Sequence, residues 1–466
     1  MYNLPRSQTA LAIIFILIVN LSCKYSSEPQ DNSNYISMAD TLESSLFSEI
    51  IGPWYPLVID TVYGGYLSNF SYDWQQLPDQ DKYLVYEARH IWTLSFLFSH
   101  YPENKEFLSN AKHGFLFLKD NLWDVEFGGF YYAVDQAGIP LEKMLHEKRV
   151  YGQAFAIYAL SEYYKVSQNL DALDLVKKAF EWIEENSHDK EYGGYFESLN
   201  RDGSPVLDSI GYKTTLNDKL AIGLKDYNSS IHILEALTSL YQVWPDKLVK
   251  ERLNEMFLII RDTMITEKGY LIQYFYANWE RVPANILDNN AGDNSWFSEH
   301  VTFGHDIETT FLLYEAAEIL DNHDDETGII IKKLTDHTLN KGWDIANGGI
   351  YDKGKYINSD SLIIIDEKKA WWSQIEGLNS LLLMHSLYPD DQIDYYHYFN
   401  NQWNYINHNL IDHEFGGWYG QGLDKSPESK NSQKAHAWKT TYHNTRGMVN
   451  CINHLRELAS VTDTHP

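Results

Sequence analysis

Histidine and acidic residues recur at helical spacing within apolar stretches of this chain. Asn228, His232 and Glu235 lie at positions i, i+4 and i+7, and therefore on one face of a predicted helix. His305 and Glu308 lie three residues apart in another apolar stretch. Imidazole exchanges protons near neutral pH, and a carboxylate one turn away can fix which ring nitrogen carries the proton. The spacing therefore indicates acid–base chemistry at histidines.

Further candidates occur in three other stretches. Trp372 and Glu376 share one face of a third predicted helix. Trp438 and His443 belong to a fourth polar and aromatic segment, and Arg89 stands at the start of an apolar helix. Taken alone, each has an ordinary structural explanation, such as a core ring or a salt bridge. Because several such faces occur on successive helices, we expect them to converge in one pit.

Two other chemistries fit some of these residues. The pairs His232–Glu235 and His305–Glu308 could each supply two metal ligands, and paired carboxylates could serve as the acid and the nucleophile or base of a glycosidase. The sequence has no HExxH motif and no histidine-rich cluster, so we expect neither a metal nor another cofactor. The number of histidines favours proton abstraction next to a carbonyl over glycoside hydrolysis.

Paired glycines flanked by aromatic residues reveal an internal repeat. Clear copies occur at 63–66, 127–130, 192–195 and 415–418, with a looser copy at 348–351 and a remnant at 268–270. Such pairs permit positive φ at a turn, and the alternating residues that follow them, as at 130–134, predict short strands or hairpins. The repeat therefore predicts a set of turns at one rim of the fold.

The segments between these turns have the apolar periodicity of helices. Residues 155–164, 231–241 and 307–319 are examples, and two helices with their loops fill one repeat. We predict an all-α fold, an (α/α)6 barrel of six helical hairpins in one domain at 38–460. An open solenoid of helix pairs is the alternative, but six units without a capping repeat favour a closed ring.

The composition favours a sugar ligand over nucleic acid. The chain has 466 residues, a formal net charge of −28 and no basic cluster, so phosphate backbones would be repelled. Its 34 Tyr and 14 Trp residues suit sugars, whose C–H faces stack on rings while the hydroxyls form hydrogen bonds. The aromatic content alone is weak support, since most of these rings belong in a core.

The first residues are typical of a bacterial lipoprotein signal. Arg6 supplies a positive charge, residues 11–21 form an apolar run too short to span a bilayer comfortably, and Cys23 precedes a polar tract. We expect residues 1–23 to be the signal and Cys23 to carry lipid. Residues 24–37 would then form a flexible tether that holds the protein at the cell envelope, its only contact with the membrane.

Details of this segment leave alternatives open. Asn20 and Leu21 differ from the residues that usually precede a lipidated cysteine. An uncleaved anchor and a plain secretory signal remain alternatives, and the protein is cytoplasmic if the signal is misread. The only other cysteine is Cys451, which excludes a disulfide framework and a cysteine zinc site.

Six segments together resemble the N-acylglucosamine 2-epimerase superfamily, and within it the cellobiose 2-epimerase branch. The matching segments follow the family's order and span nearly the whole chain after the signal: 88–93, 151–156, 228–236, 304–308, 371–376 and 438–446. The resemblance implies epimerisation at C2 of a reducing-end sugar. It implies a β-1,4-linked disaccharide of glucose or mannose as the substrate. We expect the protein to act as a monomer.

The resemblance also implies a role for each matching residue. His305 and His443 would be the acid/base pair at C2, His232 would assist ring opening, and Arg89 would hold the enediolate oxygen. Carboxylate and amide groups would orient the histidines and bind hydroxyls, namely Asn228, Glu235, Glu308 and Glu376. Aromatic side chains would line the sugar site, namely Tyr151, Trp372 and Trp438.

Two positions depart from the family pattern. Phe311 replaces a tryptophan, which puts stacking on the second sugar in doubt, and Thr440–Thr441 replaces Cys-Pro. An aldose–ketose isomerase of mannose type would pass through the same enediolate and remains an alternative. A surface glycan-binding lipoprotein without activity is another, although the intact set of histidines and Arg89 argues against it.

Overall fold

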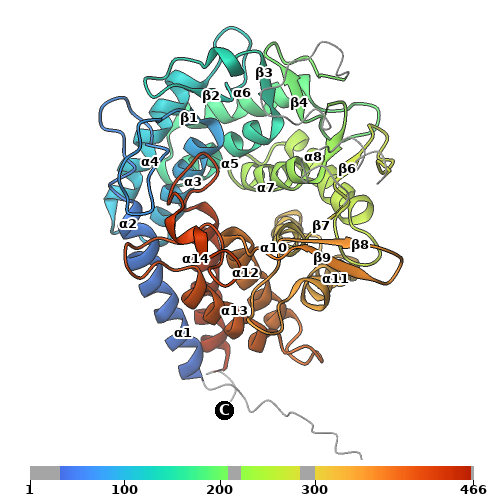
Figure 1. Cartoon of the computed structure of the whole chain (residues 1–466). Helices are drawn as coiled ribbons and strands as arrows, with labels where there is room; N and C mark the ends of the chain where they lie inside the picture. Colours follow the sequence, from blue (N-terminus) through green and yellow to red (C-terminus); the bar gives the residue numbers. More distant parts are fainter. Residues whose placement is uncertain (1–31, 208–221, 284–299, 463–466) are drawn as a thin grey trace, which may run out of the picture.

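Six helices in the described part of the chain form a closed inner ring. The computed structural model describes residues 32–207, 222–283 and 300–462. The inner helices are α3 (Leu84–His100), α5 (Val150–Ser167), α7 (Tyr227–Val243), α10 (Phe303–Leu320), α12 (Trp371–Leu387) and α14 (Tyr442–Thr462). Each packs against the next, and α14 packs against α3 (Figure 1). The predicted (α/α)6 barrel is therefore confirmed, and the open solenoid is excluded.

An outer helix packs against each inner one. The outer helices are α4 (Lys105–Phe117), α6 (Leu170–Asn186), α8 (Lys247–Ile259), α11 (Asp325–Gly342), α13 (Tyr395–Asn409) and α1 (Asn32–Ser45). Short helical segments continue or connect them, namely η1 (Leu46–Ile51), α2 (Gly52–Trp54), η2 (Leu118–Leu122), η3 (Glu142–Met144), η5 (Ile260–Met264) and η7 (Pro427–Asn431). α1 packs on α14, so the first and last described helices together form the sixth hairpin (Figure 1). The main apolar core includes buried side chains from both layers.

The barrel begins earlier in the chain than the sequence predicted. α1 starts at Asn32, and Tyr35 is buried. Residues 32–37 were therefore wrongly predicted to belong to the tether: they are helical, and the domain begins before residue 38. The polar composition of this segment hid a helix with one buried face. The predicted signal and Cys23 lie outside the described residues. None of the helices that the structure describes is long and apolar enough to cross a membrane.

The two layers of helices start in different ways. An Asn or Asp side chain accepts a hydrogen bond from a first-turn backbone N–H at the start of five outer helices: Asn104, Asn169, Asp246, Asp324 and Asp394. Such caps satisfy donors that the helix itself leaves unpaired. Four inner helices follow directly on short strands, and of these α7 also has such a cap, from Asp226 to the Ser229 N–H. The strands therefore fix where the first inner turns begin.

Those strands form small antiparallel sheets that join neighbouring repeats. β1 (Lys82–Tyr83) pairs with β2 (Ala133–Val134), β3 (Glu147–Arg149) with β4 (Ser198–Asn200), and β5 (Lys225–Asp226) with β6 (Tyr274–Phe275). β7 (Val301–Thr302) pairs with β8 (Lys353–Tyr356), which pairs with β9 (Leu362–Asp366). β1, β3, β5 and β7 lead into α3, α5, α7 and α10.

A buried lysine ties each clear glycine turn to the start of the next inner helix. In the first copy, Gly64 and Gly65 have φ of +88° and +66°. Lys82 donates to the Gly64 carbonyl and, at 2.9 Å, to Asp60, which also accepts from backbone N–H groups of the turn. The same set recurs as Lys148–Asp124–Gly128, Lys225–Asp189–Gly193, Lys369–Asp344–Gly348 and Lys434–Asp412–Gly416. The sequence revealed the glycines of this repeat but not its ion pairs.

Candidate active site

The polar side chains on the inner helices lie close to their N-terminal ends. Contacts between them link all six inner helices: Arg89 of α3 with Tyr151 of α5, Glu235 of α7 with Arg446 of α14, Arg446 with Glu308 of α10 and Glu376 of α12, and His305 of α10 with Trp372 of α12. Further contacts join Arg89 and Tyr151 to Trp438 and His232. These contacts bring the predicted residues of the inner helices together, except Asn228, whose side chain forms no hydrogen bond with the others.

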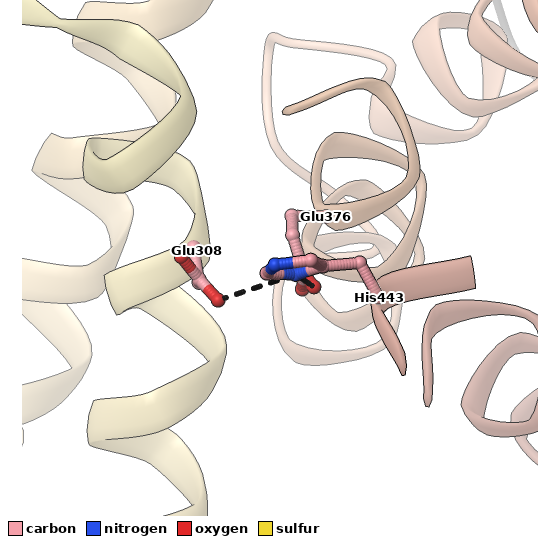
Figure 2. A group of neighbouring side chains, drawn as sticks. All are labelled: Glu308, Glu376 and His443. Atoms are coloured by element: carbon pink, nitrogen blue, oxygen red, sulfur yellow. Dashed lines mark hydrogen bonds and ion pairs between the residues drawn. The ribbon is translucent and has the colours of Figure 1, made fainter. Parts of the chain in front are cut away.

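One side of the site is built from carboxylates around His443 (Figure 2). His443 donates through Nδ1 to Oε1 of Glu376 at 2.7 Å, and Oε1 of Glu308 lies 3.7 Å from the same nitrogen. Arg446 donates through Nη2 to the same carboxylate oxygens, at 2.7 Å to Glu376 and 2.5 Å to Glu308. One guanidinium therefore lies against both members of this acidic pair.

Three ligand-type atoms of this cluster lie within 4.8 Å of one another, a spacing that a metal ion could also accept. The Nη2 group of Arg446, however, lies against one oxygen of each of Glu308 and Glu376. A cation placed among the same atoms would meet the guanidinium charge, so the donor set fits an arginine better than a metal.

The same arginine reaches the second histidine–carboxylate pair. His232 donates through Nδ1 to Oε2 of Glu235 at 2.9 Å. Oε1 of Glu235 accepts hydrogen bonds from Nη1 of Arg446 and from the Tyr442 hydroxyl. One guanidinium thus connects the carboxylate partners of His232 and His443, and both rings are held with Nδ1 protonated and Nε2 directed elsewhere.

His305 has different surroundings. Its Nδ1 forms a 3.1 Å hydrogen bond with the hydroxyl of Tyr227, and its ring centroid lies 4.5 Å from that of Trp372. Among the described residues, no carboxylate forms an ion pair with His305. Trp372 also approaches His443, with 5.7 Å between ring centroids, so one indole borders both histidines.

Burial sets the protonation of the site. Desolvation lowers the pKa of His305 and of His443, and nearby cationic groups such as Arg89 lower both further. Burial raises the pKa of Glu308 and of Glu376 to about 7 each. Burial opposes ionisation of Glu235 as well, but Arg446 and His232 outweigh it and lower the pKa. The two histidines are therefore neutral at rest and able to accept a proton.

Arg89 is buried at one edge of the site, and one nitrogen of its side chain has no hydrogen-bond partner among the described residues. Nη2 donates to the Tyr151 hydroxyl at 2.9 Å, and Nη1 donates to the Trp438 carbonyl at 3.2 Å. The group stacks over Phe155 at 4.4 Å, and its Nε has no hydrogen-bond partner among the described residues. The Trp438 side chain is 46% exposed, so this edge of the site is open to a ligand.

Several buried acceptors also lack a partner within the described residues. They are Oε2 of Glu308, Oε2 of Glu376 and Oδ1 of Asn228. Unpaired buried acceptors cost free energy unless a ligand or water satisfies them. A polyhydroxylated ligand supplies O–H donors of the required kind.

Sequence reasoning missed three residues of this arrangement. Arg446 and Tyr442 flank His443 on α14 at helical spacing, and Tyr227 directly precedes Asn228. Their positions beside predicted site residues were the available signal.

The two departures from the family pattern lie at the margin of the arrangement. Phe311 lies against Arg446, with its ring 5.9 Å from the guanidinium carbon. Thr441 shares a hydrogen bond with Tyr55.

Comparison with known proteins identifies the family of this chain. The model of the N-acylglucosamine 2-epimerase family matches residues 65–446. A cellobiose 2-epimerase from Dictyoglomus turgidum is 28% identical over 418 residues, covering 89% of this chain and 99% of that protein. The structure of cellobiose 2-epimerase from Bacillus thermoamylovorans B4167 has a TM-score of 0.76 at 25% identity, covering 90% and 99%. A D-mannose isomerase, at 20% identity and a TM-score of 0.75 over 92% and 100%, shares the fold.

Proposed function

The chain belongs to the N-acylglucosamine 2-epimerase family, and from this premise we propose that it inverts C2 of the reducing-end sugar of a β-1,4-linked disaccharide of glucose or mannose. Relatives named cellobiose 2-epimerase match it over nearly their whole length, and the chain is a carbohydrate 2-epimerase, an isomerase. The observation that carries the finer proposal is a pair of neutral histidines beside one indole, of which His443 is buried and His305 is partly exposed.

The reaction starts with the opening of the sugar ring. A C2 proton becomes acidic only when C1 is a free carbonyl, so the ring oxygen must gain a proton while the C1 hydroxyl loses one. His232 is suited to this step, because Glu235 holds its Nδ1–H and leaves Nε2 to exchange protons with the sugar.

Proton transfer at C2 follows. One neutral histidine, His305 or His443, takes the C2 proton, and the electrons of that C–H bond form the enediolate. Arg89 stabilises the developing negative oxygen, an electrostatic role that is often the largest single contribution to catalysis. The other histidine takes up a proton from solvent and delivers it to the opposite face of C2, the carbonyl re-forms, and the first histidine releases its proton to solvent.

The unpartnered acceptors of the site select a sugar. Glu308, Glu376 and Asn228 each offer a buried oxygen to a hydroxyl. The half-exposed Trp438 offers a face on which the second sugar can stack. We propose that these contacts hold the disaccharide with its reducing end between the histidines.

Product analysis tests the proposed reaction. The protein is incubated in heavy water with cellobiose, mannobiose, glucose or mannose. We expect a C2 epimer of the disaccharide that carries deuterium at C2. A ketose labelled at C1 would instead identify an aldose–ketose isomerase, release of a monosaccharide would identify a hydrolase, and no conversion would favour a glycan-binding protein. An epimer without label would contradict exchange between these histidines and solvent.

Single-histidine variants test the two-base step. With His305→Asn, the epimer that His443 deprotonates should still exchange its C2 hydrogen with solvent, while net epimerisation falls by about 10²- to 10⁴-fold. His443→Asn should show the same behaviour with the other epimer. A folded variant that epimerises at the wild-type rate would remove its histidine from the mechanism.

We also propose that Cys23 anchors the protein through lipid to the cell envelope. Stable anchoring requires more than one acyl chain, which a lipoprotein modification supplies. The wild-type protein should partition into detergent, and Cys23→Ser should release it or leave the signal uncleaved. Recovery of the wild-type protein entirely from the cytosol would overturn this proposal.

A further inference from the structure

The three histidines of the site differ in the group that holds Nδ1. His232 and His443 are held by the carboxylates of Glu235 and Glu376. His305 is held by the hydroxyl of Tyr227 at 3.1 Å. Since His305 and His443 are the two proposed bases, the site pairs one base with an anion and the other with a neutral phenol.

Tyr227 is placed to act on His305 alone among these histidines. It is the first residue of α7, and its ring meets that of His305 edge-on with 4.9 Å between centroids. Its hydroxyl also lies 3.5 Å from Oγ1 of Thr302, the residue that precedes α10. Burial raises the pKa of Tyr227, so the phenol keeps its proton.

A phenol and a carboxylate constrain a histidine differently. An ionised carboxylate only accepts, so it requires Nδ1–H and stabilises the imidazolium by its charge. A phenol can accept from Nδ1–H or donate to a bare Nδ1, and it brings no charge. His305 therefore gains less from accepting a proton than His443 does.

Cationic groups do not distinguish the two bases, because Arg89 and His232 disfavour a positive charge on His305 and on His443 alike. The direct contact at Nδ1 does distinguish them: it is Oε1 of Glu376 at His443 and the Tyr227 hydroxyl at His305. A proton taken from C2 is thus held more weakly at His305 than at His443.

We propose that Tyr227 is the positioning residue of His305, and that its neutral hydroxyl makes the two C2 epimers unequal in how fast they lose the C2 proton. The inference rests on the proposed two-histidine function. The epimer that His305 deprotonates should be the slower one to exchange. Loss of the hydroxyl should widen the gap, because Nδ1 then has no partner to fix the ring.

The test uses the full-length protein and the Tyr227→Phe variant. Each purified epimer is incubated separately in heavy water, and the initial rate of deuterium entry at C2 is followed by NMR. The epimer assigned to His305 is the one whose exchange is lost in His305→Asn. In Tyr227→Phe we expect its exchange to fall about tenfold or more, as for other residues that orient a reactive histidine. Exchange of the other epimer should change by less than about twofold.

Tyr35→Phe is the matched control. The Tyr35 hydroxyl makes the same kind of contact, at 2.8 Å to Nε2 of His385 in the last turn of α12, outside the proposed site. It removes the same chemical group, and the ratio of the two exchange rates should stay at its wild-type value. If Tyr227→Phe does not fold, Tyr227→Met serves for the same measurement.

The outcomes separate this inference from the proposed function. Wild-type exchange at neither epimer would defeat the two-histidine function itself. Wild-type exchange with equal rates for both epimers would overturn the inference. A Tyr227→Phe variant that leaves both rates unchanged, or lowers both alike, would also overturn the inference while the function stands.

Discussion

The two proposed bases, His443 and His305, lie in unlike surroundings. Around His443, burial is accompanied by charge: Glu376, Glu308 and the guanidinium of Arg446 lie in direct contact with one another or with the ring. Around His305, which is partly exposed, lie the indole of Trp372 and the phenol of Tyr227. Desolvation lowers the pKa of both histidines. The same residue type is thus kept neutral by two unlike environments.

The two sides should also differ in the free-energy cost of removing one group. On the charged side, every group depends on an opposite charge, and an unpaired buried charge is costly. On the aromatic side, a deletion leaves a smaller defect, because the contacts are neutral. The charged side should therefore tolerate substitution less well.

Arg446→Ala should have the largest effect. It leaves Glu235, Glu308 and Glu376 buried without their shared cation, and breaking such a network costs about 3–5 kcal/mol. We expect a free energy of unfolding lower by this amount in denaturant titrations, with epimerisation lost. Arg456→Ala is the control on the same helix, because its ion pair with Glu43 is 44% exposed on the arginine side and should contribute less than about 1 kcal/mol. Equal destabilisation by the two substitutions would contradict the assigned role of Arg446.

Glu376→Gln should have the second largest effect. The amide keeps the shape of the side chain but removes the charge that stabilises a protonated His443. We expect kcat to fall about 10- to 100-fold, as for other partners that orient a reactive imidazole. The variant should remain folded, which circular dichroism would verify. A larger loss from Tyr227→Phe than from Glu376→Gln would reverse the comparison of the two sides.

The pH dependence should separate activity from stability. Burial raises the pKa of Glu376 from 4.5 to about 7, so the carboxyl becomes neutral as pH falls through about 7 and His443 loses its anionic partner. Activity should therefore fall below about pH 7. The stability contribution has the opposite sign: it is fully present below about pH 4.5 and is lost as pH rises through about 7, at no more than about 1.4 kcal/mol per pH unit.

Rate profiles and unfolding curves across this range would check both trends. In Glu376→Gln the acidic fall in activity should flatten. An unchanged profile in that variant would assign the titration to another group.

Phe311→Leu should have the smallest effect. The ring lies against Arg446, and a cation–π contact of this kind contributes about 0.5–1 kcal/mol. We expect a loss of stability in that range and an unchanged ratio of rates on disaccharide and monosaccharide. A shift of this ratio by more than about threefold, roughly 0.6 kcal/mol, would instead show that Phe311 contacts the second sugar.

Local spacing in the sequence predicted contacts within a helix better than contacts between helices. His232 and Glu235 share a face of α7 and do form a hydrogen bond. His305 and Glu308 have the same spacing, yet Glu308 binds Arg446 and His305 binds Tyr227. A buried carboxylate lies against the nearest cation, and that cation comes from a helix far away in the chain.

The barrel and its repeat were predictable because glycine pairs and apolar periodicity are local signals. The buried ion pairs that hold the turns were not, since Lys82 and Asp60 are separated by a stretch of ordinary composition. The hydrogen bond between Glu376 and His443 likewise requires the closed ring. Such pairings depend on how the chain closes, which spacing alone does not encode.

The pairing of α1 with α14 also sets an order of events during synthesis. α1 leaves the ribosome early, but its buried face is covered by α12, α13 and α14, which come last in the described chain, and α14 carries His443 and Arg446. A nascent chain therefore keeps the apolar face of α1 uncovered until translation has passed these residues. Completion of the fold and assembly of the charged side of the site are consequently one event, and a truncated chain that lacks α14 has neither.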